Sequence, residues 1–321
     1  MAAGLGTRLR PYTDLEPKAL LPLLGVPVAQ FGVDALVGAG VSRIVANIHH
    51  LPERARTGLQ ALDLAGASLT LTDESACLLG SGGGIRNALP ELGQGPFFIL
   101  NADVLCDVNL KELAKRHVQL RAQWGVTVTL AIFPEPPGTG RYREILLDHD
   151  SGLITGLGEV VARKPFFVGA AVMEPEALEF APKAGPCEFV PSILIPALER
   201  KKAGFFLTNG NWFDVGSPEL WLDTHIALIE RLETGALASH WRKRVEQVSR
   251  RAGQKVWIAK DSPLDTNTSA WAGPCYWGAR GDETASPPQQ LGPHAVLYGF
   301  APPKQELSRG IGLQGVWVRA G

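Results

Sequence analysis

The sequence predicts an α/β protein in which helices cover a largely parallel sheet, followed by a small β-rich region at the C-terminus. The first part is predicted because short runs of β-branched and aromatic residues alternate with amphipathic stretches. With 321 residues, the chain is also long enough to bury a large core. The second part is predicted because the sequence after Lys255 turns to glycine, proline and short apolar groups with little helical pattern.

Five runs in the first part predict strands, and two predict helices. The expected strands are Arg43–Ile48, Ser68–Thr72, Phe97–Leu100, Val126–Phe133 and Phe166–Val172. One expected helix, Val28–Ala39, has its apolar residues near one face, and the other, Leu110–Trp124, carries the mixed charges of a solvated helix. The segment Pro134–Gly140 can continue neither structure and predicts a surface loop.

A third helix is expected from Ser217 to about Leu232. Ser217 can act as its N-cap, and the proline and glutamate that follow suit the first turn. The basic stretch His240–Arg251 could bind phosphate or lipid headgroups, but a solvated connecting helix is the simpler interpretation. We therefore expect one large domain over 1–235 and a helical linker over 236–255.

A period of six residues indicates the kind of β structure over the remaining residues, 256–321. Apolar or small residues recur at this spacing in three groups: Ile258, Leu264, Ala270 and Tyr276; Leu291 and Leu297; and Ile311 and Trp317. This period is typical of hexapeptide-repeat β-helices, which predicts a left-handed β-helix. The register breaks between the first two groups, so an irregular β-rich tail remains the alternative.

Composition and charge exclude several classes of partner. Acidic and basic residues nearly cancel, giving a formal net charge of -1, so we expect no nucleic-acid partner and no membrane partner. No apolar run approaches about 18 residues, and the chain opens on a glycine-rich motif instead of a leader. The four cysteines are scattered without a CxxC pair, which predicts reduced thiols and a cytoplasmic location.

The stretch 2–27, AAGLGTRLRPYTDLEPKALLPLLGVP, has the composition of a polyphosphate-binding loop. Gly4 and Gly6 lack the Cβ atoms that would keep backbone N–H groups away from phosphate oxygens. Arg8 offers a planar fork of donors, and Lys18 adds a compact positive charge. The stretch lacks the third glycine of a dinucleotide fingerprint and contains no GxxxxGK[ST], which argues against a dehydrogenase and against a P-loop NTPase.

Three further segments could take part in a site. PFFILNADV is an apolar strand that ends near Asp103, where ligands gather in open α/β sheets. NWFDVGSPELW places Asp214 before a glycine and a helix cap. Taken alone, each aspartate also fits a turn residue. LLGSGGGIRNAL carries a run of glycines; a flexible linker would explain it, although a linker is unexpected inside a compact domain.

The motifs GLGTRLRP and EPKALLPL resemble the signature of the sugar-1-phosphate nucleotidylyltransferase superfamily, and the resemblance covers roughly residues 2–232. It implies a Rossmann-like, mostly parallel nucleotidyltransferase domain. The implied reaction joins an NTP, with GTP or UTP favoured, to a sugar 1-phosphate with release of pyrophosphate. The implied cofactor is Mg²⁺. Some members carry a hexapeptide β-helix tail that mediates assembly, which implies a homo-oligomer formed through the C-terminal domain.

The resemblance also implies roles for individual residues. Arg8 and Lys18 are expected to stabilise charge on the reacting phosphates. Asp103 and Asp214 are expected to hold magnesium, with Asp107 as a weaker candidate. Two glycine-rich segments are expected to bind the triphosphate and the base: Ala2, Ala3, Gly4, Leu5, Gly6 and Thr7, and Gly80, Ser81, Gly82 and Gly83.

On the sugar side the chain departs from the family pattern. Many relatives carry an E-K-P segment whose glutamate binds sugar hydroxyls, whereas this chain reads GEVVARKPFFVGAAV. Lys164 and Pro165 match the last two residues of that pattern, and the nearest upstream acid is Glu159. We expect Glu159 and Gly169 to contact the sugar.

The start of the chain and the function each leave a question open. Family members begin with a strand that leads into L-A-A-G, and Met1 stands at the position of the leucine. Because a central strand contributes ladder bonds and core contacts, we expect natural coding sequence upstream that adds it. Two rival functions remain: a non-catalytic homologue that binds a nucleotide sugar and a partner subunit, and nucleotidyl transfer to a non-sugar phosphate such as phosphocholine.

Overall fold

The computed structural model describes residues 1–135, 141–262, 271, 273–278, 291–292, 294–298, 309–313 and 316–319. The chain divides into two compact units. Unit 1 consists of Met1–Leu5 and Ala29–Trp212, and unit 2 consists of Gly6–Val28 and Phe213–Gly321. The sequence-based boundaries near residues 235 and 255 stay a prediction. Within the described ranges, every helix falls short of the length or the apolarity that a membrane-spanning helix needs.

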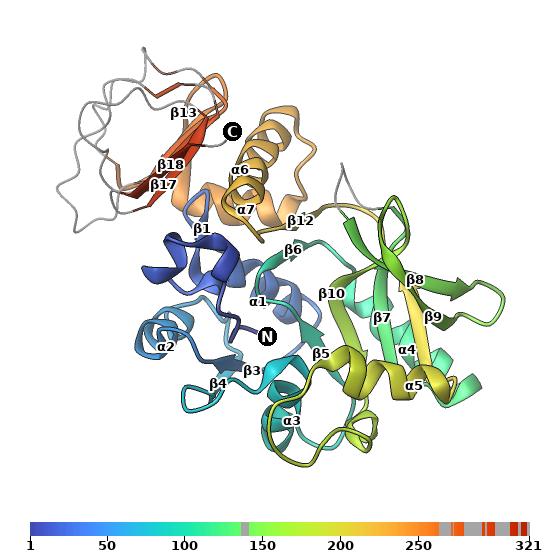
Figure 1. Cartoon of the computed structure of the whole chain (residues 1–321). Helices are drawn as coiled ribbons and strands as arrows, with labels where there is room; N and C mark the ends of the chain where they lie inside the picture. The colour runs from blue at the N-terminus through green and yellow to red at the C-terminus, as the bar shows by residue number, and fades with distance from the viewer. Residues whose placement is uncertain are drawn as a thin grey trace. The chain divides into compact units, whose positions relative to one another are not determined.

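Unit 1 is built on a six-stranded sheet with the strand order β5-β10-β7-β11-β9-β8 (Figure 1). Its strands, in chain order, are β5 (Phe97–Leu100), β7 (Val128–Phe133), β8 (Arg141–Asp148), β9 (Leu153–Ala162), β10 (Phe166–Met173) and β11 (Ala203–Leu207). A second sheet pairs β3 (Arg43–Ile48) with β4 (Ser68–Asp73) in parallel. The expected strands are therefore confirmed to within two residues at each end.

The expectation of a largely parallel sheet is wrong for the six-stranded sheet, which is mixed. Its β11–β7 pair is parallel, and the β5–β10, β10–β7, β11–β9 and β8–β9 pairs are antiparallel. The reason lies in β10, whose residues are nearly all buried. A continuous apolar run is typical of a parallel strand, but it also suits an antiparallel strand that is covered on both faces.

The described helices of unit 1 pack on its two sheets. They are α1 (Val28–Gly38), α2 (Pro52–Gln60), α3 (Gly80–Leu92), α4 (Leu110–Trp124) and α5 (Ile195–Glu199). The first residue of α1, Val28, belongs to unit 2. Helix α2 contacts the β3–β4 pair. Alternate residues of β10 enter two apolar cores. Met173 packs in one core with Ile85 of α3. Val172 packs in the other with Leu113 of α4.

The predicted helix α4 has the expected bounds because both of its ends are capped. The side chain of Asn109 accepts a hydrogen bond from the Glu112 N–H, and Gly125 ends the helix in a left-handed conformation with φ of 67°. The first residues of the expected loop, Pro134 and Glu135, do lie outside regular structure. Residues 136–140 of that loop lie outside the described ranges.

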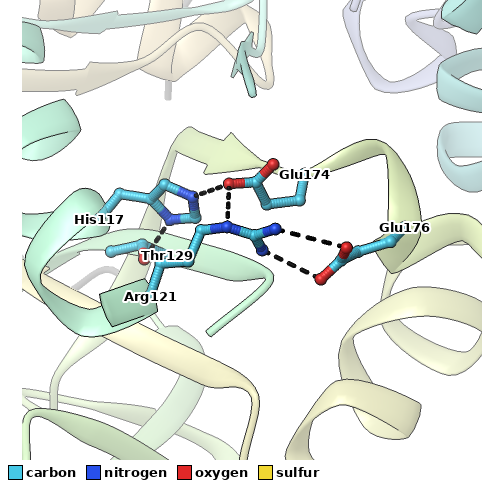
Figure 2. A network of polar contacts seen from close by, with 5 residues as sticks. All are labelled: His117, Arg121, Thr129, Glu174 and Glu176. Atoms are coloured by element: carbon cyan, nitrogen blue, oxygen red, sulfur yellow. Dashed lines mark hydrogen bonds and ion pairs between the residues drawn. The ribbon is translucent and has the colours of Figure 1, made fainter. Parts of the chain in front are cut away.

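A polar network fixes α4 against the sheet (Figure 2). His117 Nδ1 lies 2.8 Å from Thr129 Oγ1, and His117 Nε2 lies 3.2 Å from Glu174 Oε1. Arg121 Nε lies 3.0 Å from the same Glu174 oxygen, and Arg121 also pairs with Glu176. Burial lowers the pKa of His117, so the neutral ring is favoured. This network gives buried polar groups their partners and is structural.

In its described residues, unit 2 combines the segment 6–28 with the α-helices α6 and α7 and a set of short strands. Helix α6 (Pro218–Thr234) begins as predicted, with Ser217 Oγ accepting a hydrogen bond from the Leu220 N–H at 3.3 Å. Helix α7 (Ser239–Val248) covers most of the basic stretch. The rest of that stretch belongs to strand β13 (Ser249–Gly253), so the expected helical linker is only partly helical.

The C-terminal strands form one sheet in sequence order. They are β13, β14 (Val256–Ala259), β15 (Cys275–Gly278), β16 (Ala295–Tyr298), β17 (Gly310–Leu313) and β18 (Val316–Arg319). Strands β14 to β17 are parallel, and β13 and β18 pair with their neighbours in antiparallel register. Ile258 faces Trp277 instead of Tyr276, so the spacing of six is not kept between these strands. Leu264 and Ala270 lie outside the described ranges, and the β-helix stays a prediction.

Buried polar groups join the segment 6–28 to the rest of unit 2. The main chain of this segment also contains the short elements β1 (Pro22–Leu23) and β2 (Val26–Pro27). Side chains of the later elements bond to its main chain, and one of its own side chains reaches back to them. These bonds run from Tyr12 Oη to Ile311 O (2.5 Å), from Trp221 Nε1 to Pro22 O (2.9 Å), from Ser249 Oγ to Leu24 O (2.7 Å) and from Gly25 N to Tyr298 Oη (3.4 Å).

His225 lies at the centre of this cluster and predicts a dependence of stability on pH. Its Nδ1 lies 2.8 Å from the Trp221 carbonyl, which can only accept, so Nδ1 carries the proton and Nε2 accepts from Tyr298 Oη at 2.6 Å. Burial lowers the pKa of His225 to about 4. The unfolded chain, with a histidine pKa near about 6.5, therefore binds more protons between these two values.

The free energy of unfolding should fall by up to about 3 kcal/mol as the pH falls from about 6.5 to about 4, and should change little from this group above that window. Urea titrations from pH 4.5 to pH 7.5 measure it. The substitution His225→Phe should reduce the slope, leaving the smaller contribution of His117. An unchanged slope in His225→Phe would rule out this assignment.

Candidate active site

Arg8 and Asp214 lie close together in unit 2, on either side of Gly216. A Cβ atom added to Gly216 would lie 2.9 and 3.0 Å from the two Asp214 carboxylate oxygens and 3.1 Å from Arg8 Nη2. With a glycine at this point, both side chains approach the backbone closely. Asp214 ends strand β12 (Trp212–Asp214), and Arg8 lies in a short 3₁₀ turn, Thr7–Leu9. The Arg8 guanidinium and the Asp214 carboxylate, which are far apart in the sequence, therefore both lie beside Gly216.

Gly6 and Lys18 form the second close pair of unit 2. Gly6 has φ of 61°, a conformation that favours glycine. A Cβ atom there would lie 2.7 Å from Thr13 Cγ2 and 3.3 Å from Lys18 Cβ. The Gly6 carbonyl accepts from the Leu9 N–H at 2.8 Å and from Thr13 Oγ1 at 2.9 Å. These bonds fix the turn that carries Arg8, and they hold it against the base of the Lys18 side chain.

Gly4 belongs to unit 1, and packing does not require a glycine at this position. It is exposed, and a Cβ atom added to it would meet no atom of the described residues within 4 Å. Before it, the Ala2 N–H donates to Asn47 Oδ1 at 2.7 Å, and Asn47 Nδ2 donates to Glu74 Oε1 at 2.8 Å. This arrangement fixes the start of the glycine loop. Of the remaining residues expected to bind the triphosphate, Ala3 is buried and Leu5 and Thr7 are exposed.

Asp103 follows β5 in a turn of unit 1, as expected from its position at a strand end. Two residues before it, Asn101 packs over Gly169, whose φ is 88° and whose added Cβ would lie 3.1 Å from Asn101 Nδ2. Gly169 lies where the β10–β7 register shifts, between Phe167 and Ala171. Gly169 therefore has a packing reason to be glycine, and it lies at the same end of the sheet as Asp103.

Asp107 has a structural role. Its two carboxylate oxygens accept hydrogen bonds from the Asn211 backbone N–H and from Asn211 Nδ2, both at 2.7 Å. Its own N–H donates to the Asn211 carbonyl at 3.1 Å. Gly210, with φ of 115°, leaves room for this carboxylate. Asp107 therefore holds the segment that leads to Asp214, and both of its oxygens are already engaged.

The glycines Gly80 to Gly83 form the first turn of α3. They allow close approach to the segment Cys187–Glu188: the Gly82 and Gly83 N–H groups both donate to Cys187 O at 2.9 Å. A Cβ atom at Gly80 would lie 2.6 Å from Glu188 Oε1. Ser81 Oγ donates to Glu188 Oε2 at 2.5 Å. Packing against this segment therefore explains much of the glycine run.

The two residues expected to contact the sugar, Glu159 and Gly169, lie in strands of unit 1. Glu159 is exposed on β9. Lys164, one of the two residues that match the E-K-P pattern, pairs with Glu144 of β8 at 3.5 Å. A Cβ atom at Gly158 would lie 2.5 Å from Glu144 Oε2, which shows how closely β9 approaches this side chain. The sequence analysis missed Glu144, because its partnership with Lys164 arises from strand pairing.

The candidate carboxylates, Asp103 and Asp214, fit a magnesium ion that takes its other ligands from the substrate and water. Among the described residues, no group of three or more histidine, cysteine, aspartate or glutamate side chains could enclose a metal ion. Mg²⁺ commonly takes one or two protein carboxylates and completes its shell with phosphate oxygens and water. Asp214 belongs to unit 2 and Asp103 to unit 1, so their joint use remains a prediction.

Comparisons with known proteins agree with these motifs. Residues 1–231 match the family model described as "Nucleotidyl transferase". An N-acetylmuramate alpha-1-phosphate uridylyltransferase of Caulobacter vibrioides is 30% identical over 239 residues, which cover 72% of this chain and 96% of that protein. A mannose-1-phosphate guanyltransferase of Kluyveromyces lactis is 30% identical over 241 residues. The match covers 72% of this chain and 64% of the yeast protein, so this chain spans less than two thirds of that relative's length.

Solved structures show the same fold. HddC from Yersinia pseudotuberculosis, in a complex with GMP-PN, superposes with a TM-score of 0.58 at 21% identity. The superposition covers 71% of this chain and 96% of HddC. A UDP-glucose pyrophosphorylase in complex with UDP-glucose gives a TM-score of 0.55 at 20% identity, covering 72% and 97% of the two chains. These likenesses establish a mixed α/β nucleotidyltransferase fold.

Proposed function

This chain belongs to the sugar-1-phosphate nucleotidylyltransferase superfamily, and from that premise we propose that it is an enzyme that joins an NTP to a sugar 1-phosphate and releases pyrophosphate. The observation that carries the proposal is the grouping of Gly6, Arg8, Lys18 and Asp214 in one compact unit, in two close pairs. The relatives named above transfer uridylyl and guanylyl groups, which supports UTP or GTP as the donor.

In the proposed reaction a phosphate oxygen of the sugar 1-phosphate attacks the α-phosphorus of the NTP. A new P–O bond forms, the bond from the α-phosphorus to the bridging oxygen breaks, and pyrophosphate leaves with the electron pair. Negative charge grows on the equatorial oxygens and on the pyrophosphate. Arg8 and Lys18 offset this charge, and no covalent enzyme intermediate is needed. Asp103 and Asp214 are the carboxylates that would hold Mg²⁺, which would supply further charge neutralisation.

We assign the recognition of base and sugar to unit 1. Gly80, Ser81, Gly82 and Gly83 line the base pocket by shape, since the N–H groups of Gly82 and Gly83 already donate to Cys187. Glu159 and Gly169 contact the sugar. The free state of all four cysteines supports a cytoplasmic location, and the C-terminal strands are proposed to form a homo-oligomer.

Two rivals make different predictions in one assay. A non-catalytic homologue would bind a nucleotide sugar without turnover. An enzyme that transfers the nucleotidyl group to a non-sugar phosphate would use phosphocholine. Pyrophosphate release, measured with Mg²⁺ for four NTPs crossed with several sugar 1-phosphates and phosphocholine, should be fastest for GTP or UTP with a sugar 1-phosphate. Release with phosphocholine alone, or binding of nucleotide sugars with no release from any pair, would replace the proposal by the corresponding rival.

The two glycines of the loop should respond differently to substitution by alanine. Gly4→Ala adds a methyl group to open space, so thermal stability should be unchanged, while the KM for NTP should rise because the methyl group hinders approach of the phosphates. Gly6→Ala should lower the free energy of unfolding by about 1–3 kcal/mol, since it forces alanine into a left-handed conformation against Thr13. Thermal unfolding and initial rates measure both. Loss of stability in Gly4→Ala, without an effect on KM, would contradict the ligand-facing role.

A further inference from the structure

Glu74 is a buried carboxylate to which the proposed reaction gives no role. It directly follows β4, and the residue is 2% exposed. This position is at the carboxyl ends of the parallel strands β3 and β4, where ligands gather in α/β folds. The hydrogen bonds to its side chain come from neutral N–H groups. Burying a charge costs free energy, so this carboxylate calls for a reason beyond packing.

The side chain of Glu74 joins two segments that are far apart in the sequence. Its Oε1 accepts from Asn47 Nδ2 at 2.8 Å, and its Oε2 accepts from the N–H of Leu79, the residue before α3, at 3.1 Å. Asn47 Oδ1 in turn accepts from the Ala2 N–H at 2.7 Å. A buried series of three hydrogen bonds therefore connects the start of the glycine loop with the start of α3.

The chemistry of these groups fixes the orientation of the Asn47 amide. A main-chain N–H can only donate, and a carboxylate can only accept. Asn47 therefore has to turn its oxygen toward Ala2 and its NH₂ group toward Glu74. A glutamine in place of Glu74 has one acceptor atom, which Leu79 requires, and its NH₂ group would then face the NH₂ group of Asn47. The charge at this position is what lets both partners donate at once.

The surroundings of the Asn47–Glu74 pair are adapted to it. Helix α3 packs beside β3 and β4 (Figure 1), and a Cβ atom on its Gly84 would lie 2.7 Å from Asn47 Nδ2 and 2.9 Å from Glu74 Oε1. The main chain of Glu74 is held separately, because its N–H donates to Ile48 O at 2.8 Å and its carbonyl lies 2.6 Å from His49 Nδ1. A change of the Glu74 side chain should therefore leave its main chain in place.

We propose that Glu74 is a positioning residue: its carboxylate orients the Asn47 amide, and the two side chains hold the glycine loop at Ala2 in a fixed relation to the start of α3. The glycine loop is the segment assigned to the triphosphate, and the start of α3 is the segment assigned to the base. These bonds would then set the spacing between the two parts of the NTP site. The expected effect on NTP affinity rests on the proposed function, whereas the expected effect on the bonds does not.

The substitution Glu74→Gln tests the need for a carboxylate in the full 321-residue chain. Because Asn47 loses its fixed orientation, amide hydrogen exchange at Ala2 should become about tenfold faster or more. Exchange at Leu79, which can still donate to the new glutamine oxygen, should change less. The KM for NTP in the pyrophosphate-release assay should rise by about tenfold, with kcat within about threefold of normal, since binding is affected and chemistry is not.

A second substitution should restore what the first removes. In the double variant Glu74→Gln with Asn47→Asp, the new glutamine accepts from Leu79 and donates to the new aspartate, whose other oxygen accepts from Ala2. Each hydrogen bond of the series is then satisfied again. Exchange at Ala2 and the KM for NTP should return to within about threefold of normal. Asn47→Asp alone sets two carboxylates against each other and should lower the thermal midpoint.

Asp73→Asn is the matched control. Asp73 is the neighbouring acid in the sequence, is exposed, and bonds to the Ser75 N–H and to Arg56. Its substitution should change neither the exchange at Ala2 nor the KM for NTP. An equal effect in Asp73→Asn and Glu74→Gln would therefore contradict a specific role of Glu74.

Two further results would overturn the proposal. One is unchanged exchange at Ala2 in Glu74→Gln. The other is a double variant that is no better than Glu74→Gln in exchange, KM and thermal midpoint, because the carboxylate would then act in some way other than by orienting Asn47. If the unmodified chain released no pyrophosphate from any substrate pair, the proposed reaction would fall, and exchange at Ala2 in the single and double variants would still decide the role of Glu74.

Discussion

Replacing Lys18 by alanine is expected to lower turnover by more than about a hundredfold, the scale of losing one contact to charge that develops in the transition state. Lys18 begins a short 3₁₀ turn, and its Cβ lies 3.3 Å from the position of a Cβ on Gly6. The ammonium group is therefore attached beside the loop that is proposed to wrap the triphosphate. Removing it leaves the growing charge on the phosphates without its nearest compact cation.

Initial rates of pyrophosphate release at saturating substrates measure this loss. Lys18→Arg keeps the charge but changes its shape and should recover only part of the rate. Arg10→Ala is the matched control, because Arg10 lies between Arg8 and Lys18 in the sequence, is largely exposed and pairs with Asp14. Its rate should be near normal. Near-normal turnover in Lys18→Ala would remove Lys18 from the mechanism.

Replacing Asp214 by alanine is expected to cause a loss of similar size, more than about a hundredfold in turnover, for a different reason. Asp214 is the carboxylate proposed to hold Mg²⁺, and it shares the space around Gly216 with Arg8. Its loss removes a metal ligand and also the acidic neighbour of a catalytic cation. The Mg²⁺ concentration needed for half-maximal rate should therefore rise as well.

Turnover across a range of Mg²⁺ concentrations, with thermal unfolding of the same samples, measures this effect. Asp223→Ala serves as the control, because Asp223 is an exposed carboxylate on α6 and should change neither quantity. A variant Asp214→Ala that folds normally and keeps both its turnover and its Mg²⁺ requirement would contradict the assignment. The pair of experiments thus tests charge compensation and metal binding separately.

Sequence patterns predicted the helices and strands whose ends are set by neighbouring residues, such as helix caps. The helix Leu110–Trp124 has its expected bounds because Asn109 and Gly125 cap it, and both caps are visible in the sequence. The helix that begins after Ser217 follows the same logic. The strands Arg43–Ile48 and Phe97–Leu100 match the expected ranges because short apolar runs define them.

Features that depend on distant partners were missed. The direction of β10 was misjudged because burial on both faces, and not its direction, sets its apolar pattern. The glycines at the start of α3 are expected to bind the base, but the sequence did not show that they also let α3 pack against Cys187 and Glu188. The residues around Gly80 do not indicate contacts with residues about a hundred positions later. A glycine that allows another segment to pack closely therefore cannot be distinguished in the sequence from a glycine that binds a ligand.

The same limit applies to the candidate site. The sequence identified Gly6, Arg8, Lys18 and Asp214 through their motifs, and unit 2 contains all four. It did not reveal that the segment 6–28 is tied to the C-terminal strands by bonds such as Tyr12 Oη to Ile311 O. The C-terminal region therefore supports the loop that carries both cations, a relation that only long-range contacts could show.

The central claim is nucleotidyl transfer at the α-phosphorus, and the fate of a label on that atom tests it most directly. The chain is incubated with Mg²⁺, a sugar 1-phosphate and GTP or UTP labelled at the α-phosphate. The account predicts that the label appears in a nucleotide sugar, that the released pyrophosphate is unlabelled, and that Lys18→Ala suppresses both products. Label that remains in the triphosphate, or that appears in free nucleoside monophosphate without a nucleotide sugar, would contradict it.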